Sequence, residues 1–146
     1  MKRGISILTA LVLILITGSK VYSTKNADEN GVKITLTDLF NISKSKSFEK
    51  AAKLIAYDGE DKNRLKKDSF NPANKDELTQ VKRICKKINA LMELSSKYEF
   101  SDFKTMNLEG KETYSMNVVF FSGNQKLVTN FTFIKNEKTF LLIGMN

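Results

Sequence analysis

The hydrophobic period of this 146-residue chain changes near Tyr98, and that change limits the folds open to it. Before Tyr98, apolar residues recur at helical spacing. After it they alternate with polar residues, as in strands with one buried face. Turn signals at Glu109-Gly110, Gly123-Asn124 and Asn136-Glu137 separate four alternating runs, and such short connections join antiparallel neighbours. The sequence therefore predicts an α+β domain with helices first and a curved four-stranded antiparallel sheet last.

The expected strands cover residues 98–106, 112–121, 126–135 and 138–144. In the second and third strands, the side chains expected to share one apolar face are Tyr114, Met116, Val118 and Phe120, and Leu127, Phe131 and Phe133. An apolar sheet face must be covered, and the amphipathic helices are the available cover.

Three helices are predicted before the sheet. The first covers residues 34–43, the second follows Ser47 and ends at Asp58-Gly59, and the third runs from Lys75 to about Ser96. Asn74 precedes the third helix as its N-cap, with Glu77 three positions later as in a capping box. The inward stripe of this long helix is Leu78, Val81, Ile84, Ile88 and Leu91. The charged stretch 60–73 is expected to be an irregular connector.

The N-terminal residues are typical of a secretory signal. Lys2 and Arg3 form a basic head, an apolar run from Ile5 to Ile16 follows, and a polar exit leads to an expected cut after Ser23, with Gly18 or Ser19 as alternatives. A helix of about a dozen residues rises only about 18 Å, too short for a hydrocarbon layer of about 30 Å. We therefore expect a signal peptide over 1–23, a flexible lead-in over 24–33 and one domain over 34–146, in a periplasmic or secreted protein.

Charge and cysteine content restrict the classes of partner that we expect and the ways in which the fold can be stabilised. The net charge of +8 falls to +5 without Lys2, Arg3 and Lys20, and the remaining lysines are scattered among acids. A nucleic-acid partner, which favours clustered basic residues, is therefore not expected. Membrane contact is expected only through the signal peptide. Cys85 is the single cysteine, so no intramolecular disulfide can form and stability must come from packing.

The order of these elements resembles the nuclear transport factor two-like superfamily, which is close in shape to cystatin-like folds, and especially its small exported bacterial members of unknown role. The resemblance extends from about Ile34 to the end, with residues 48–59 and Asn63-Arg64 similar to the second-helix region. It implies a cone in which the sheet wraps around the long helix, with a wide end able to hold a small hydrophobic ligand. It also implies that fold alone does not choose between enzymes and binding domains.

The chemistry missing from the chain removes most catalytic options. There is no histidine, and one cysteine cannot form a thiolate cluster, so no metal site and no cofactor are expected. Enzymes of the resembled superfamily commonly use a His-Asp pair, which this chain cannot form, or an Asp base facing a Tyr hydroxyl. No catalytic residue is assigned, and the chain is expected not to be an enzyme.

Four residues are candidates for lining a pocket. Asp102 is the best candidate base, because strand alternation places it on the face of Tyr98 and Phe100, where an apolar setting would raise its pKa. Tyr114 offers a hydroxyl. Tyr57 and Arg64 lie near the second helix and could flank the mouth of the cone.

Three functional hypotheses remain. The leading one is an exported, non-enzymatic binding or interaction domain for a small hydrophobic ligand or a protein partner. The first alternative is a small isomerase or dehydratase with Asp102 as proton acceptor. The second is a self-associating structural domain, a homodimer paired through the exposed sheet face.

Overall fold

The computed structural model describes residues 5–61, 63–64, 68–137 and 139–146, with side chains from Thr24 onward. Lys2 and Arg3 of the expected signal, and Lys138 at the expected start of the last strand, lie outside these ranges. The chain forms two compact units, residues 1–30 and residues 31–146. The first unit is helical from Ile5. Among the described residues, no helix combines the length and apolar character needed to cross a membrane.

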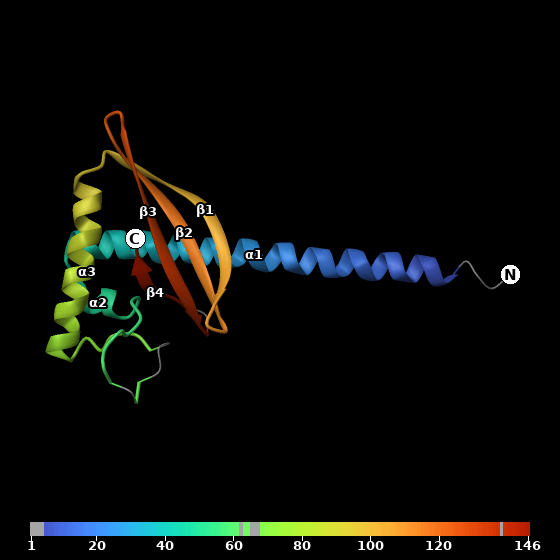
Figure 1. Ribbon diagram of the computed structural model, residues 1–146, viewed down its shortest axis with the longest axis horizontal. Helices are drawn as coiled ribbons and strands as arrows, with labels where there is room; N and C mark the ends of the chain where they lie inside the picture. The colour runs from blue at the N-terminus through green and yellow to red at the C-terminus, as the bar shows by residue number, and fades with distance from the viewer. Residues whose placement is uncertain (1–4, 62, 65–67, 138) are drawn as a thin grey trace. The chain divides into compact units, whose positions relative to one another are not determined.

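The second unit contains one curved sheet of four strands (Figure 1). The strands are β1 (Lys97–Leu108), β2 (Lys111–Ser122), β3 (Gln125–Asn136) and β4 (Thr139–Met145). Each pairs antiparallel with the next, in the order β1-β2-β3-β4. Glu109 and Gly110 close the first hairpin with φ of 51° and 77°, the positive values that a two-residue type I′ turn requires. The predicted meander is confirmed.

Three helices precede the sheet: α1 (Ile5–Ser45), α2 (Phe48–Ala52) and α3 (Lys75–Glu93). The predicted N-cap of α3 is confirmed, because Asn74 Oδ1 accepts hydrogen bonds from the backbone N–H groups of Asp76 at 3.0 Å and Glu77 at 3.2 Å. The Glu77 carboxylate does not complete the capping box. It bonds instead to Arg64 and to the backbone N–H of Asn71.

The flexible lead-in predicted for residues 24–33 is wrong, and so is the separate helix starting at Ile34. Helix α1 runs without a break through both segments. Burial on the second unit begins at Val32, which is fully buried, and Gly31 lies so close to Phe140 that an added Cβ would overlap the ring. Between Thr24 and Asn30 the side chains are mostly polar and exposed or half-buried, so the helix carries no apolar period there to reveal it.

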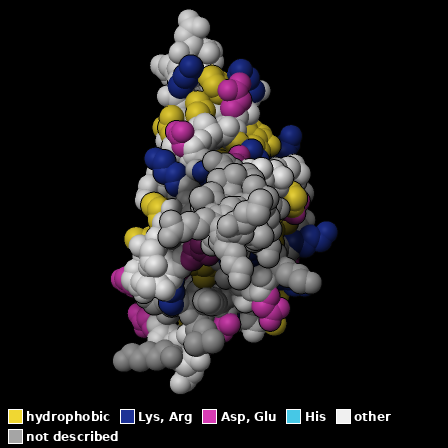
Figure 2. Space-filling model, turned by 90° about the vertical axis from the view of Figure 1, so that its right-hand side faces the viewer, with side chains coloured by type: hydrophobic (Ala, Val, Ile, Leu, Met, Phe, Trp, Pro, Cys, Tyr) yellow, Lys and Arg dark blue, Asp and Glu magenta, His cyan; other side chains and the backbone are white. Residues whose placement is uncertain are grey.

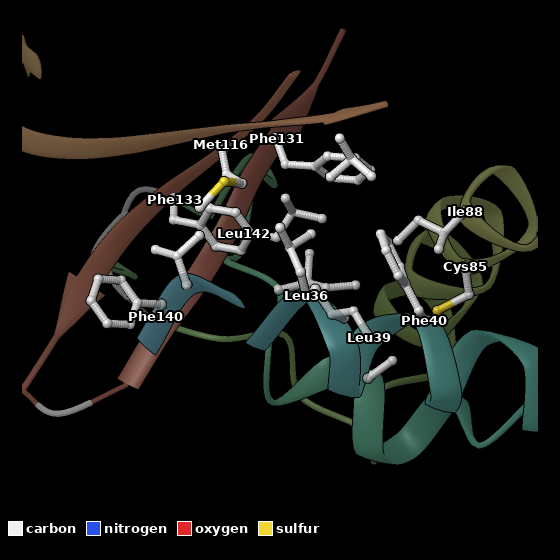
Figure 3. Packing of buried hydrophobic residues seen from close by; sticks show 14 of the residues in the cluster. Leu36, Leu39, Phe40, Cys85, Ile88, Met116, Phe131, Phe133, Phe140 and Leu142 are labelled. Carbon is white, nitrogen blue, oxygen red and sulfur yellow. The ribbon is translucent and has the colours of Figure 1, made fainter. Parts of the chain in front are cut away.

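Helices α1 and α3 cover the inner face of the sheet, and their apolar side chains point toward it (Figure 3). The fully buried side chains include Leu36, Leu39 and Phe40 of α1, Val81, Cys85 and Ile88 of α3, and Met116, Val118, Phe131 and Phe133 of the sheet. The predicted inward faces of α3 and of strands β2 and β3 are therefore confirmed. Helices packed on an open antiparallel sheet make this an α+β fold, as expected.

An aromatic cluster fills the centre of the inner face. The Phe40 ring lies 5.0 Å from Tyr98, 6.0 Å from Phe120 and 5.8 Å from Phe131, measured between ring centroids. These separations are those of favourable tilted and edge-to-face pairs. Packed rings therefore fill the centre of the inner face.

Candidate functional site

The four candidate pocket residues do not converge on one site. Tyr114 is 2% exposed and belongs to the core. Its hydroxyl donates to Glu112 Oε2 at 2.6 Å, and its ring meets Phe140 edge to face at 5.1 Å. Tyr114 also borders a polar hollow of about 320 Å³ between the tips of the β1–β2 and β3–β4 hairpins. The Tyr114 hydroxyl is thus bonded to the Glu112 carboxylate, and both residues line this hollow together with other charged side chains.

Asp102 is exposed, which corrects its predicted inward orientation. The register of β1 against β2 shifts between Ser101 and Lys104, and Asp102 has a φ of 47° at this irregularity. Such a bulge interrupts strict alternation, so the face of Asp102 could not be inferred from Tyr98 and Phe100. The carboxylate accepts a long hydrogen bond of 3.4 Å from Asn117 Nδ2 on the outer face. The isomerase alternative thereby loses its base.

Tyr57 and Arg64 do come together. The Arg64 guanidinium carbon lies 3.8 Å from the centroid of the Tyr57 ring, a close cation–π contact. Arg64 Nη1 also donates to Glu77 Oε1 at 2.6 Å, and Nη2 donates to the Ser69 carbonyl oxygen. The hydrogen bond to Glu77 raises the pKa of Arg64 above its ordinary value, so the guanidinium stays charged.

Glu77 holds the other end of this network. Its side chain is 11% exposed, and its second oxygen accepts from the backbone N–H of Asn71 at 2.6 Å. The charge is thus paired and hydrogen-bonded, which a nearly buried carboxylate requires. Arg64 and Glu77 therefore join the chain before α3 to the start of that helix, with the guanidinium held against the Tyr57 ring.

The segment that carries Tyr57 is joined to the edge of the sheet. Ile55 bridges Leu142 of β4 in parallel, and the backbone N–H of Ala56 donates to the Leu142 carbonyl at 2.9 Å. On its other side, the Tyr57 N–H donates to the Asp68 carbonyl at 2.7 Å. Gly59 follows closely, and an added Cβ there would overlap the Tyr57 ring. The Tyr57 side chain is held from several directions.

These contacts form one wall of a pocket of about 330 Å³, here called the Tyr57 pocket. Its lining is Ala56, Tyr57, Asp58, Leu108, Glu109, Lys111, Thr113, Ile134 and Ile143. Ala56 and Ile134 are buried in a small cluster with Leu141, separate from the main core. The register pairs Thr113 with Ile134, on the side of the sheet opposite Tyr114 and Phe133. The pocket therefore lies on the outer face.

The Tyr57 pocket contains one of the four predicted residues. The residues of its floor were not predicted from the sequence. Ile134 and Leu141 are paired across β3 and β4 and both face outward, where alternation alone predicts solvent exposure. Their apolar character at outward positions was the sequence signal that could have indicated this floor. A second apolar outward patch on a sheet implies a second cover, which here is residue Ala56 beside the β4 edge.

Figure 2 shows side chains of both signs, lysine or arginine and aspartate or glutamate, among the coloured residues of the face that it presents. This agrees with the mild net charge.

No family model matches the chain, and no curated protein matches it. The chain is similar to a solved structure titled as a variant of Rd1NTF2_05, with 14% identity over 83% of this chain and 96% of that chain and a TM-score of 0.48. The α+β arrangement described above rests on this chain's own helices, strand order and register.

Proposed function

We propose that this chain is an exported, non-enzymatic binding domain that holds a small, mostly apolar molecule in the Tyr57 pocket. The observation that carries the proposal is the wall of the pocket, which is fixed before any ligand arrives. Preorganised sites bind well because little conformational entropy remains to be lost. The volume of about 330 Å³ falls within the range of about 300–1,000 Å³ typical of small-molecule sites.

The lining suits an apolar molecule with a polar group at one end. Ala56 and Ile134 form a buried floor, and the exposed edges of Leu108 and Ile143 add apolar walls. Asp58, Glu109 and Lys111 supply charges of both signs around it. A ligand with a hydroxyl or amide could therefore be oriented by these groups while its apolar part covers Ile134.

The absence of enzymatic activity is supported by composition and by the position of Asp102. The chain has no histidine, and the carboxylate that was the best candidate base is exposed on the outer face. Export is supported by the basic head, apolar run and polar exit over residues 1–23. Its test is the N-terminus of the protein recovered outside the cytoplasm, which should lie near Thr24. An uncut leader on a cytoplasmic product would contradict export.

The binding site is tested with the neutral fluorescent probe N-phenyl-1-naphthylamine. Ile143→Glu places a carboxylate on the apolar wall and should weaken probe binding by about tenfold or more. Val128→Glu is the matched control, because Val128 is another exposed apolar residue of the outer side that does not line the pocket. It should leave the affinity unchanged.

A second variant tests the wall itself. Gly59→Ala should displace the Tyr57 ring and weaken probe binding in the same direction, because the added Cβ overlaps that ring. Unchanged probe affinity in both Ile143→Glu and Gly59→Ala would show that the probe binds elsewhere, and the Tyr57 pocket would be rejected as the site.

Self-association is a second candidate function, favoured by exposed apolar side chains on the sheet. Met106 and Leu108 of β1 are 38% and 50% exposed, and Val128 of β3 is 55% exposed. Light scattering at several protein concentrations separates the two functions. A constant monomer mass excludes pairing, whereas a dimer that Val128→Glu disrupts would favour it.

A further inference from the structure

A second hollow lies between α3, the end of α1 and the start of α2. It has a volume of about 500 Å³ and is here called the Lys86 hollow. Its lining is Ser43, Lys46, Phe48, Lys82, Cys85, Lys86, Asn89, Ala90 and Glu93. None of these residues lines the Tyr57 pocket, so the two sites are separate.

Helix α3 supplies one wall of the hollow from a single face. Lys82, Lys86, Asn89 and Glu93 are spaced by three or four residues, so their side chains lie on successive turns of the same side of the helix. The two lysines are exposed, whereas Cys85 between them is fully buried. This wall therefore carries two cations beside a closed floor.

The turn that ends α1 supplies a third lysine. Lys46 has a φ of 57°, the left-handed conformation for which glycine is preferred directly after a helix. Its backbone N–H donates to the Ser43 carbonyl at 3.3 Å, and that of Ser47 donates to the Ile42 carbonyl at 3.1 Å. These two bonds form a Schellman motif, which fixes the backbone of Lys46 at the hollow. A lysine thus occupies a position that glycine would fill with less strain.

The charges of the hollow are unbalanced. Among the described residues, no ion pair involves Lys46, Lys82 or Lys86. Glu93 is the acid of the described lining, and its Oε1 accepts a hydrogen bond from Asn89 Nδ2 at 2.8 Å. Three lysines against one glutamate leave an excess of two positive charges around one hollow. Charge complementarity therefore favours an anionic occupant.

The lining also includes a buried hydroxyl whose hydrogen bonding is incomplete. Ser43 is 2% exposed, and within the part of the chain that the structure describes its Oγ has no hydrogen-bond partner. The neighbouring Cys85 thiol is a weak hydrogen-bonding group and does not satisfy it. Buried hydroxyls without a partner are uncommon in native proteins, so this position favours an occupant that carries oxygen atoms.

We propose that the Lys86 hollow binds a phosphate monoester of a small organic molecule. Lysine ammonium groups bind phosphate as point charges, and a dianionic phosphate neutralises the excess of two positive charges, whereas a carboxylate would neutralise one. The organic part contacts Ala90 and the ring of Phe48, whose centroid lies 5.8 Å from the Lys82 ammonium. This proposal is independent of the function proposed for the Tyr57 pocket.

Calorimetric titration of the full-length protein with phenyl phosphate at about pH 7.5, where the ester is a dianion, tests the proposal. Phenyl sulfate has a similar shape but a single negative charge, and it should bind about fivefold more weakly. Inorganic phosphate lacks the ring and should also bind more weakly than phenyl phosphate. Phenol lacks the anionic group and should bind most weakly of the four.

Two neighbouring lysines of α3 provide a matched pair of variants. Lys86→Gln should weaken phenyl phosphate binding by about fivefold, because an exposed charge that contacts the ligand is lost. Lys87→Gln removes the same charge from an exposed residue that does not line the hollow, and it should leave the affinity within about twofold. Ile143→Glu in the Tyr57 pocket should not change it.

A third variant separates binding from stability. Lys46→Gly should weaken phenyl phosphate binding to a similar extent as Lys86→Gln, but it should raise the temperature of thermal unfolding, because glycine adopts the left-handed conformation without strain. Weaker binding by a more stable protein cannot be attributed to unfolding.

Equal losses in Lys86→Gln and Lys87→Gln, or equal affinities for phenyl phosphate and phenyl sulfate, would overturn the proposal. Binding to double-stranded DNA or to phosphatidylglycerol vesicles without binding to phenyl phosphate would also overturn it and would identify this surface as a general contact for polyanions.

Discussion

The two faces of the sheet are formed by the same strands but carry different kinds of side chain. On the inner face, Phe131 and Phe133 are fully buried beneath α1 and α3. On the outer face, Asn130 links two neighbours in a polar row, donating to Ser115 Oγ at 2.6 Å and to Asn117 Oδ1 at 2.7 Å. The inner face is occupied by rings, whereas polar groups and hollows lie outside it. Side chains that stabilise this fold are thus separated from those available for binding.

This difference between the two faces explains why the four candidate residues do not line a pocket on the inner face. Tyr114 lies on the inner face, where its surroundings are already filled, and Asp102 lies on the outer side, away from it. The Tyr57 pocket lies on the outer face. This site is therefore found outside the main core.

The largest expected effect comes from two adjacent residues of β3. Phe131→Ala should lower the free energy of unfolding by about 3–5 kcal/mol, because a fully buried ring is lost. Asn130→Ala on the outer face should lower it by only about 1 kcal/mol, the value of a typical hydrogen bond. Urea denaturation measures both. Equal losses would contradict the division between the faces.

The same comparison can be made on α3. Ile88→Ala should cost about 2–5 kcal/mol, since Ile88 is fully buried, whereas Lys86→Ala on the exposed side should cost less than about 0.5 kcal/mol. Guanidinium titrations of both variants test this. A damaging Lys86→Ala would mean that the helix is rotated about its axis and that the inner face is wrongly assigned.

The ion pair beneath the Tyr57 pocket should matter more than one in solvent. Glu77→Gln keeps the shape but removes the charge that bonds Arg64, and it should cost about 1–3 kcal/mol. The control is Glu99→Gln, which breaks the exposed Lys97–Glu99 pair and should cost no more than about 1 kcal/mol. Thermal unfolding compares the two. A smaller loss in Glu77→Gln than in Glu99→Gln would show that the pocket wall is not held by this network.

The smallest expected effect is a dependence of stability on pH, caused by the buried Cys85 on the inner side of the sheet. Burial raises the pKa of the Cys85 thiol above its ordinary value, and the nearby Ser43 hydroxyl opposes this shift. As pH rises, the unfolded chain ionises first, so stability is complete below the ordinary thiol pKa and falls as pH rises toward the folded value. Between about pH 8 and 10, the wild type should therefore lose more stability than Cys85→Ala. Identical pH profiles would show that the folded thiol is not shifted.

Sequence alone was sufficient wherever local pattern and burial agree. The N-cap at Asn74, the positive φ at Glu109 and Gly110, and the inward stripe of α3 follow from short-range rules, and the structure contains them. The four strands begin and end within a few residues of the expected positions.

The failures arise where structure depends on distant residues. The bulge at Asp102 is a pairing irregularity between β1 and β2, and no residue pattern in β1 marks it. The floor of the Tyr57 pocket depends on Ala56 meeting β4. Arg64 meets Glu77 across a connector that has no periodicity. Each of these features depends on contacts between separate segments, which a local sequence pattern does not specify.

The bridge between Ile55 and Leu142 determines when the fold can be completed during synthesis. On one side, the segment after α2 pairs with β4, the last described strand in the chain. A nascent chain therefore cannot close this sheet edge or complete the outer cluster until β4 has been synthesised, and contacts so distant in sequence form slowly. During that interval the edge of the sheet beside β3 and the outer cluster remain incomplete.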